Sequence, residues 1–286
     1  MNLAPRPRWN RGRARVGSWD ASLAWRWVGT VLVLTLALTL PLALRSEPRD
    51  DRGTGRATDK VLFAPRFATS GLVTNELAYR HPHRPGVRLS PDWVVTSGSL
   101  FADRGAGWSG VVDDVSPGID SRHATNSAVL RAVSRRTDLR DVSVRLRLVV
   151  DRLTETESTG RRDFDGVHLM LRYRDADHLY YLSVCRRDGV VAIKKKAAPG
   201  AGPARYTTLA QGRWPCRHRV WRTAQVEVRN TPRGVALSLE VGGRRVLTAL
   251  DRGQDGTAPL TGAGRVGIRG DNAELHLRDL VVRSLR

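Results

Sequence analysis

Short runs in which apolar and polar residues alternate fill the second half of the chain. In residues 141–150, DVSVRLRLVV, valine or leucine occupies every second position, and serine or arginine fills most positions between. A period of two is typical of a strand with one buried face. Turn residues such as Asp188-Gly189 and Gly242-Gly243 divide the runs, so the pattern predicts an all-β sandwich. The other predicted strands are residues 166–173, 178–185, 189–195, 224–230, 234–241, 244–250, 264–270 and 273–282.

One apolar run is of a different kind. Residues 27–44, WVGTVLVLTLALTLPLAL, carry no charge and as a helix would span about 27 Å, close to a bilayer core of about 30 Å. Six arginines and one aspartate precede the run, so the positive-inside rule predicts that residues 1–26 are cytoplasmic and the remainder is exported. The segment PLALRSEP offers no clean A-x-A site of the kind that signal peptidase requires. We expect an uncleaved single-pass anchor in the cell membrane, with a cleaved signal peptide as the alternative.

Residues 45–59, RSEPRDDRGTGRATD, are charged, contain glycine and show no apolar period, which predicts a flexible tether. Residues 60–286 are then the extracytoplasmic domain, and both cysteines, Cys185 and Cys216, belong to it. An oxidising compartment favours a disulfide between them. A metal pair is the alternative, but two cysteines without further spaced ligands make a poor zinc site.

The chain is strongly basic, with 48 lysines and arginines, 28 aspartates and glutamates and a formal net charge of +20. The excess extends into the domain, where 38 basic residues stand against 23 acidic ones. This charge favours anionic partners such as an acidic polysaccharide, a phosphate-rich wall polymer or a membrane surface. Nucleic acid fits the charge but not the predicted export.

Three of the four lysines of this arginine-rich chain are adjacent, at positions 194–196. If Asp188-Gly189 is the two-residue turn of a hairpin, Leu182 pairs with Lys195. If a second turn covers residues 174–178, Arg172 pairs with Tyr180 and His168 with Val184. The register places a set of four polar side chains on one face of the sheet: His168, Arg172, Tyr180 and Lys195.

This set offers cations for an anionic group and an aromatic ring for a sugar. The alternative is that the face is core and that its charged ends extend to solvent. An unpaired buried lysine is costly, so we expect the Lys195 ammonium to reach solvent or a groove. Lys194 and Lys196 point to the opposite face in this register, and a one-residue slip would reverse the cross-strand matches.

Two further sites are candidates. Trp108 lies in the glycine-rich segment GAGWSG and is a candidate sugar platform. In GIRGDN, Asp271 and Asn272 could supply oxygen ligands to calcium. Plain turn chemistry is the alternative for this pair.

Several segments resemble exported actinobacterial proteins of the concanavalin A-like class, which is related in shape to laminin-G modules and family 16 glycoside hydrolases. The resemblance covers residues 61–286 and implies a jelly roll of two curved antiparallel sheets. It also implies adjacent first and last strands and a concave face that commonly binds glycans. The matching segments are TNELAY (74–79), SPDWVVTSGSLFADRGAGWSG (90–110), DGVHLMLRY (165–173), LYYLSVCRRDG (179–189), IKKK (193–196) and GRVGIRGDNAELHLRDLVV (264–282).

Hydrolases of that class carry E-x-D-x-x-E on one strand, and this sequence has no such motif. The sequence therefore favours a membrane-anchored carbohydrate-binding module for an anionic envelope or environmental glycan over an enzyme. A polysaccharide lyase or a glycoside hydrolase-like enzyme is the alternative, because a lyase needs a cation for the uronate carboxylate and a base for the adjacent proton. His168, Arg172, Tyr180 and Lys195 contain those residue types. A structural envelope protein without a ligand is the third reading.

Overall fold

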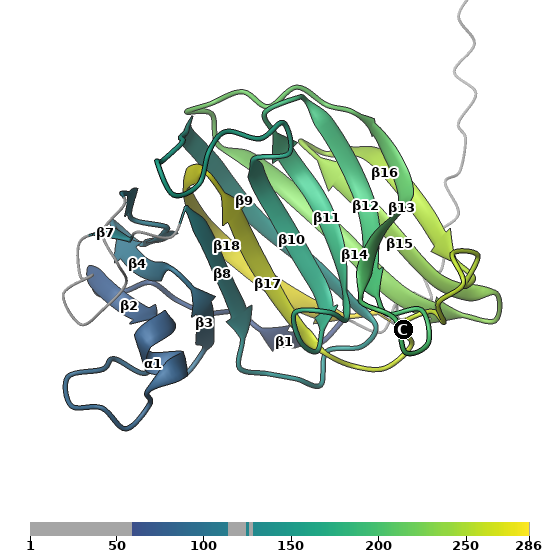
Figure 1. The fold of residues 1–286 in the computed structure, drawn as a ribbon, viewed down its shortest axis with the longest axis horizontal. Coiled ribbons are helices and arrows are strands. Elements are labelled where there is room, and N and C mark those ends of the chain that lie inside the picture. The colour runs from purple at the N-terminus through teal and green to yellow at the C-terminus, as the bar shows by residue number, and fades with distance from the viewer. Residues whose placement is uncertain (1–58, 114–123, 126–127, 286) are drawn as a thin grey trace, which may run out of the picture. The chain divides into compact units, whose positions relative to one another are not determined.

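The computed structural model describes residues 59–113, 124–125 and 128–285 of the chain. These residues form a sandwich of two large antiparallel β-sheets, here called sheet A and sheet B (Figure 1). No helix among them is long and apolar enough to cross a bilayer. The predicted anchor at residues 27–44, and the predicted tether up to residue 58, lie outside the described residues.

Sheet A combines long central strands with short strands from the beginning of the domain, and β1 (Val61–Phe63) pairs with its strand β18. In spatial order its strands are β16 (Arg244–Asp251), β15 (Gly234–Val241), β14 (Arg222–Thr231), β9 (Val142–Leu153), β18 (Ala273–Ser284), β5 (Ala106–Trp108), β4 (Ser99–Asp103) and β2 (Gly71–Asn75).

Sheet B packs against sheet A and is built mainly from consecutive hairpins. Its strands, in spatial order, are β13 (Arg205–Arg213), β12 (Val190–Ala197), β11 (Leu179–Arg186), β10 (Gly166–Tyr173), β17 (Arg265–Asp271), β8 (Val129–Ser134) and β3 (Trp93–Ser97). Beside the two sheets lie the parallel pair β6 (Val111–Val112) and β7 (Ala124–Thr125) and the short helix α1 (Glu76–Arg80).

Side chains from the facing sides of the two sheets form a hydrophobic core. In β15, Val235, Leu237, Leu239 and Val241 are buried and the residues between them are half-buried. Burying an aliphatic side chain of this size contributes about 1.5–3 kcal/mol, so the alternation decides which face of the strand turns inward. β1 pairs with β18, so the first and last strands are adjacent, as the resemblance implies.

The alternating runs of the sequence correspond to β9–β12 and β14–β18, which confirms the predicted all-β sandwich. The pattern does not predict β1–β8, β13 or α1. The strands among β1–β8 are two to six residues long, too short for a period of two to stand out. Helix α1 has a local signal, since the Asn75 side chain accepts a hydrogen bond from the Ala78 amide as an N-cap.

The outer faces of the two sheets differ in exposure. On sheet A, outward side chains such as Arg145 and Ser238 are exposed or half-buried. On sheet B, the outward residues His168, Met170 and Ser183 are 0%, 1% and 0% exposed. A flat sheet would leave these positions open to solvent. Side chains that project further from the sheet must therefore surround them. The outer face of sheet B is therefore hollowed.

Candidate functional site

The register of the β10–β11 hairpin differs from the predicted one. His168 lies opposite Ser183 rather than Val184, because the ladder shifts by one residue at a β-bulge beside His168. Side chains alternate along a strand, so the slip turns His168 to the outer face of sheet B, whereas Tyr180 and Lys195 point into the interior. The predicted grouping is therefore wrong for His168, whereas Arg172, Tyr180 and Lys195 do share the interior face.

Lys195 is fully buried between the sheets. Its Nζ donates to Asp251 Oδ1 at 3.1 Å, to Asp255 Oδ1 at 2.8 Å and to the carbonyl oxygen of Thr257 at 2.9 Å. The hydroxyl of Tyr180 donates to Asp251 Oδ2 at 2.7 Å. Two carboxylates and a carbonyl thus replace the water that the ammonium loses on burial. The prediction that Lys195 reaches solvent or a groove is wrong.

Arg172 is also buried inside the sandwich. Its guanidinium donates to Asn230 Oδ1 at 2.7 Å, to the carbonyl oxygen of Leu260 at 2.6 Å and to Asp141 Oδ1 at 2.9 Å. Its φ of 49° lies in the left-handed region, at an irregularity of the β10–β17 ladder between Met170 and Tyr173. This bend directs the side chain inward, where it links β10 to β14 and to the loop that contains Leu260.

The buried ion pairs predict a loss of stability in acid. Burial would raise the pKa of Asp255, but hydrogen bonds from Lys195 and Thr257 outweigh it and lower the pKa from 3.8 to about 2. A lowered carboxyl pKa stabilises the fold above the unfolded-state value and is lost as pH falls towards the folded-state value. Between pH 5 and pH 2 we expect this carboxyl to remove about 2 kcal/mol from the free energy of unfolding. Urea unfolding across that range should show a shallower pH dependence in Asp255→Asn, and identical slopes would contradict the assignment.

A cavity of about 240 Å³ lies on the outer face of sheet B, and we call it the sheet B hollow. Strands β10, β11, β12, β13 and β17 and the loop before β10 contribute its side chains. These are Phe164, His168, Tyr181, Ser183, Arg186, Lys194, Tyr206, Arg269 and Asp271.

The floor of the hollow is a hydrogen-bonded network around Asp271. Arg269 Nε donates to both carboxylate oxygens of Asp271 at 2.9 Å, and the Tyr181 hydroxyl donates to Oδ2 at 3.2 Å. Burial opposes ionisation of Asp271, but contacts with His168 and Arg269 outweigh it and lower the pKa. Burial and the charge of Asp271 raise the pKa of Tyr181 well above 10, so its hydroxyl stays protonated.

Lys194 brings to the wall of the hollow a positive charge without a direct ion-pair partner among the described residues. The side chain is half-buried, and no described residue accepts a hydrogen bond or forms an ion pair with its Nζ. Burial, followed by the positive charge of Arg186, lowers the pKa of Lys194. Arg186 itself pairs with Asp188, and Arg269 pairs with Asp271. Lys194 is thus the cation of the hollow that has no direct ion pair among the described residues, although the charge of Asp188 acts on it.

Aromatic side chains form part of the rim. Tyr206 is 43% exposed and Phe164 is 49% exposed, and the Tyr206 ring lies 5.4 Å from that of Tyr181. Lys196 Nζ lies 5.5 Å from the Tyr206 ring centroid and donates to Asp177 Oδ1 at 2.7 Å. Exposed aromatic rings over a polar floor can stack against a sugar face while the floor binds its hydroxyl groups.

The floor contains the residue types of a hydrolytic triad. Ser183 Oγ lies 3.0 Å from His168 Nδ1, and His168 Nε2 lies 3.4 Å from Asp271 Oδ2. However, Ser183 and His168 are both fully buried in the middle of the sheet, where the ladders to neighbouring strands occupy the backbone amides that an oxyanion hole would need. Burial lowers the pKa of His168 from 6.5, so the imidazole is neutral at pH 7. Ser183 and His168 therefore help to hold Asp271 in place, and Ser183 is not exposed as a nucleophile.

Trp108 lies away from the hollow, on the outer face of sheet A. It pairs with His276 across β5 and β18, and their rings stack with centroids 5.7 Å apart and planes 9° apart. The Trp108 side chain is half-buried and lines a second, more open cavity of about 610 Å³ together with Phe101, Asp103 and Arg88. The structure thus separates Trp108 from the other predicted site residues.

The predicted calcium ligands have different partners. Asp271 faces the sheet B hollow and is paired with Arg269, whereas the Asn272 amide donates to Asp165 Oδ2 at 3.1 Å and to the carbonyl oxygen of Gly160 at 3.2 Å. Asn272 has a φ of 44°, which suits asparagine in the turn between β17 and β18. The part of the chain that the structure describes contains no cluster of three or more histidine, cysteine or acidic side chains around a common point.

Sequence reasoning reached two residues of the hollow, His168 and Asp271, for other reasons than the structure gives. It missed Tyr206, because β13 lacks a clear alternation. Arg269 had a usable signal, since it precedes Asp271 by two residues on one strand and must share its face. The predicted separation of Lys194 from Lys195 onto opposite faces is confirmed, but the sequence gives no sign that Lys194 lines a cavity.

The sequence matches no family model and no curated protein sequence. Solved structures with a similar fold include LamAcat from Zobellia galactanivorans, 9% identical over 79% of this chain and 98% of that chain, with a TM-score of 0.50. A LamA variant from Z. galactanivorans in complex with laminaritriose and laminaritetraose is 8% identical over 79% and 99%, also with a TM-score of 0.50. Carbohydrate binding module CBM66 from Bacillus subtilis is 16% identical over 67% and 95%, with a TM-score of 0.44. The likeness to LamAcat shows the fold of this chain, an antiparallel β-sandwich of the jelly-roll type.

Proposed function

We propose that the chain is a membrane-anchored, extracytoplasmic carbohydrate-binding module that holds an acidic residue of an anionic glycan in the sheet B hollow. The observation that carries the proposal is the unpaired ammonium of Lys194, half-buried beside the exposed rings of Tyr206 and Phe164. A carboxylate of the ligand would balance this charge. One sugar ring would pack against the aromatic rim.

The size of the hollow supports recognition of a single sugar residue within a polymer. Its volume of about 240 Å³ is below the range of about 300–1,000 Å³ that is usual for pockets of drug-sized ligands. The Asp271 carboxylate is held by Arg269 and Tyr181, and can accept a hydrogen bond from a sugar hydroxyl without moving. The LamA complex with two laminari-oligosaccharides supports this use of the fold.

Binding is favoured over lyase chemistry by the state of the candidate bases. His168 is fully buried, its Nδ1 lies 3.0 Å from Ser183 Oγ, and its ring stacks on Tyr181 with centroids 4.4 Å apart. Tyr181 is itself held protonated by its raised pKa. Neither group is poised to take a proton from a uronate, which leaves the cations and rings of the hollow to a binding role.

We expect Lys194→Ala to weaken the binding of polygalacturonate about tenfold, because one charged contact in a partly desolvated site is lost. Affinity of the detergent-solubilised full chain is measured by titration calorimetry at low salt. Raising the salt concentration should reduce the difference between the proteins, since screening weakens partly exposed charges.

Lys60→Ala is the matched control, because Lys60 is an exposed lysine at the start of the domain and its loss changes the net charge equally. An equal loss of affinity in the two variants would mean that the effect arises from the overall charge of the protein. That result would contradict a site in the hollow. Neutral laminarin serves as the uncharged ligand. Release of unsaturated sugar ends from polygalacturonate, abolished in His168→Ala, would instead favour the lyase.

A further inference from the structure

The outer face of sheet A carries a second group of positively charged side chains. This group lies on the other sheet from the hollow. Arg147 of β9 and Arg278 of β18 lie directly opposite each other in the ladder. The guanidinium carbons of both lie near the ring of Trp221, at 5.8 Å for Arg147 and 4.4 Å for Arg278. One tryptophan thus orients two guanidinium groups on adjacent strands.

Among the described residues, one long ion pair, from Arg278 to Asp279, stands against these two guanidinium groups. Like charges directly opposite each other on neighbouring strands are destabilising. Among the described residues, Arg147 has no acidic partner, and Arg278 Nε is buried without a hydrogen bond. Arg278 Nε lies 3.8 Å from Asp279 Oδ2, but the Asp279 side chain is 65% exposed and extends into solvent. The two guanidinium groups, opposite each other on neighbouring strands, could both bind one anion.

The positive charge continues along the two strands. Arg145 precedes Arg147 by two residues and faces the same side, and Arg283 of β18 lies opposite Ser143 in the next row. Rows on one face of a strand are about 6.6 Å apart, so three successive rows each contribute an arginine. We call these four residues the arginine stripe: Arg145, Arg147, Arg278 and Arg283.

Two other charged groups on the same face have partners on the same or a neighbouring strand. Arg245, on the edge strand β16, lies opposite Glu240 of β15. Glu227 of β14 accepts hydrogen bonds from Gln225 and Ser238. The stripe brings four arginines together on β9 and β18, and Glu227 of β14, opposite Ser143, is an acidic side chain beside it.

We propose that the arginine stripe binds the sulfate or phosphate ester groups of a linear polyanion, at a site separate from the sheet B hollow. A guanidinium donates two parallel hydrogen bonds to an oxyanion. A carboxylate has two oxygens, and one guanidinium can hydrogen-bond to both. A sulfate or phosphate ester group has three free oxygens, so Arg147 and Arg278 can both bind it. The repeated rows fit a ligand that carries such groups at regular intervals along an extended chain.

The test uses heparin, a sulfated linear polysaccharide, and the full chain in detergent. We expect the double variant Arg147→Gln/Arg278→Gln to bind heparin about tenfold more weakly than the unaltered protein. Arg245→Gln, which removes one exposed arginine from the same face, should leave the affinity unchanged. Arg145→Gln should weaken binding by a smaller factor, and it provides a second measurement if the double variant does not fold.

Polygalacturonate separates this inference from the proposed function. Loss of heparin binding in the arginine variant, with unchanged polygalacturonate binding, supports a second site whether or not Lys194→Ala affects the hollow. Equal heparin affinity in the double variant and in Arg245→Gln would overturn the proposal. It would also be overturned if the two arginines governed binding to micelles containing phosphatidylglycerol and not to heparin, because the partner would then be a lipid surface.

Discussion

Lys195→Ala is expected to lower the free energy of unfolding by about 3–5 kcal/mol, because removing one member of a buried ion pair leaves the other charge without a partner. Asp251 and Asp255 lie 3.1 Å and 2.8 Å from Lys195 Nζ, and their side chains are 0% and 6% exposed. The substitution would leave both carboxylates in the interior with no cation. Urea unfolding followed by tryptophan fluorescence measures the loss.

The neighbouring Lys194 is the matched control for this prediction. It lies in the same strand and the same sequence run, but its side chain points to the hollow and has no described partner. We expect Lys194→Ala to change the free energy of unfolding by less than about 0.5 kcal/mol. Similar losses for the two substitutions would mean that Lys195 is not the buried partner of the two aspartates.

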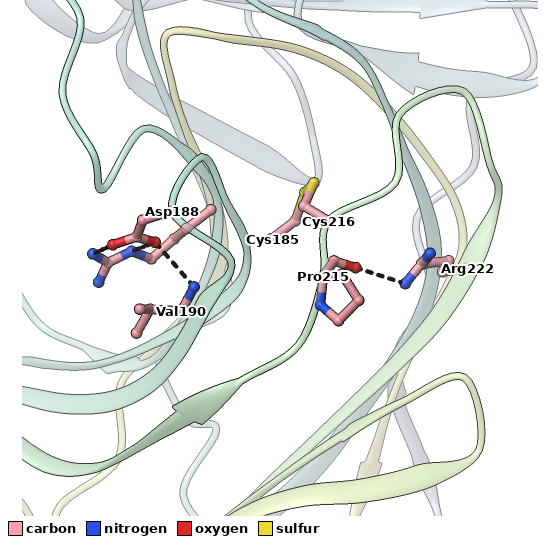
Figure 2. The surroundings of a disulfide bond; sticks show 7 residues. Cys185, Asp188, Val190, Pro215, Cys216 and Arg222 are labelled. Atoms are coloured by element: carbon pink, nitrogen blue, oxygen red, sulfur yellow. Dashed lines mark hydrogen bonds and ion pairs between the residues drawn. A yellow bond between two sulfur atoms is a disulfide. The ribbon is translucent and has the colours of Figure 1, made fainter. Parts of the chain in front are cut away.

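Reduction of the disulfide is expected to cost about 3–4 kcal/mol of stability, since the cross-link closes a loop of 31 residues in the unfolded chain. Cys185 at the end of β11 is bonded to Cys216, in the connection between β13 and β14 (Figure 2). The bond confirms the pairing predicted from the sequence and excludes the metal-pair alternative. In the same connection the carbonyl of Pro215 accepts a hydrogen bond from Arg222 at 3.2 Å.

Unfolding is measured with and without a thiol reductant. The variant Cys185→Ala/Cys216→Ala is the control, and its stability should not respond to the reductant. An equal response of both proteins would show that the reductant acts elsewhere. No response in the unaltered protein, with complete reduction verified by thiol titration, would mean that the bond contributes nothing to stability.

The strands of the second half of the domain could be predicted because each buries one face. Alternation marks β9 and β15 plainly, and the turns between strands are rich in glycine, aspartate and asparagine. What alternation cannot supply is the register. The β11–β12 turn shows this: the Gly189 amide donates to the Arg186 carbonyl at 3.1 Å, so the turn begins one residue earlier than an Asp188-Gly189 turn would. Gly189, with a φ of 70°, follows the turn as a bulge residue.

Errors in the predicted strand register affected the prediction of the candidate site more than the prediction of the fold. A shift of two residues in the β11–β12 hairpin keeps every side chain on its predicted face, so Tyr180 and Lys195 remain together. A shift of one residue in the β10–β11 hairpin separates His168 from them. The bulge and the left-handed Arg172 that accompany the shift have no simple sequence signature, because arginine rarely adopts a positive φ.

The partners of Lys195 could not be predicted either. Asp251 and Asp255 lie 56 and 60 residues further along the chain, in and after β16. Only the packing of the loop after β16 against sheet B brings them to the lysine. The sequence alone does not show these partners, and a buried lysine without a partner is costly. The sequence therefore predicts that Lys195 is exposed to solvent.

The central claim is that an acidic sugar binds in the sheet B hollow, and a crystal structure with a galacturonate trisaccharide tests it most directly. We predict that one sugar carboxylate lies within about 3 Å of Lys194 Nζ, the usual length of a charge-assisted hydrogen bond, with its ring against Tyr206. Two results would contradict the account. One is a crystal saturated with the trisaccharide in which the sugar lies on sheet A beside Trp108. The other is an empty hollow in such a crystal, although the protein binds the trisaccharide in solution.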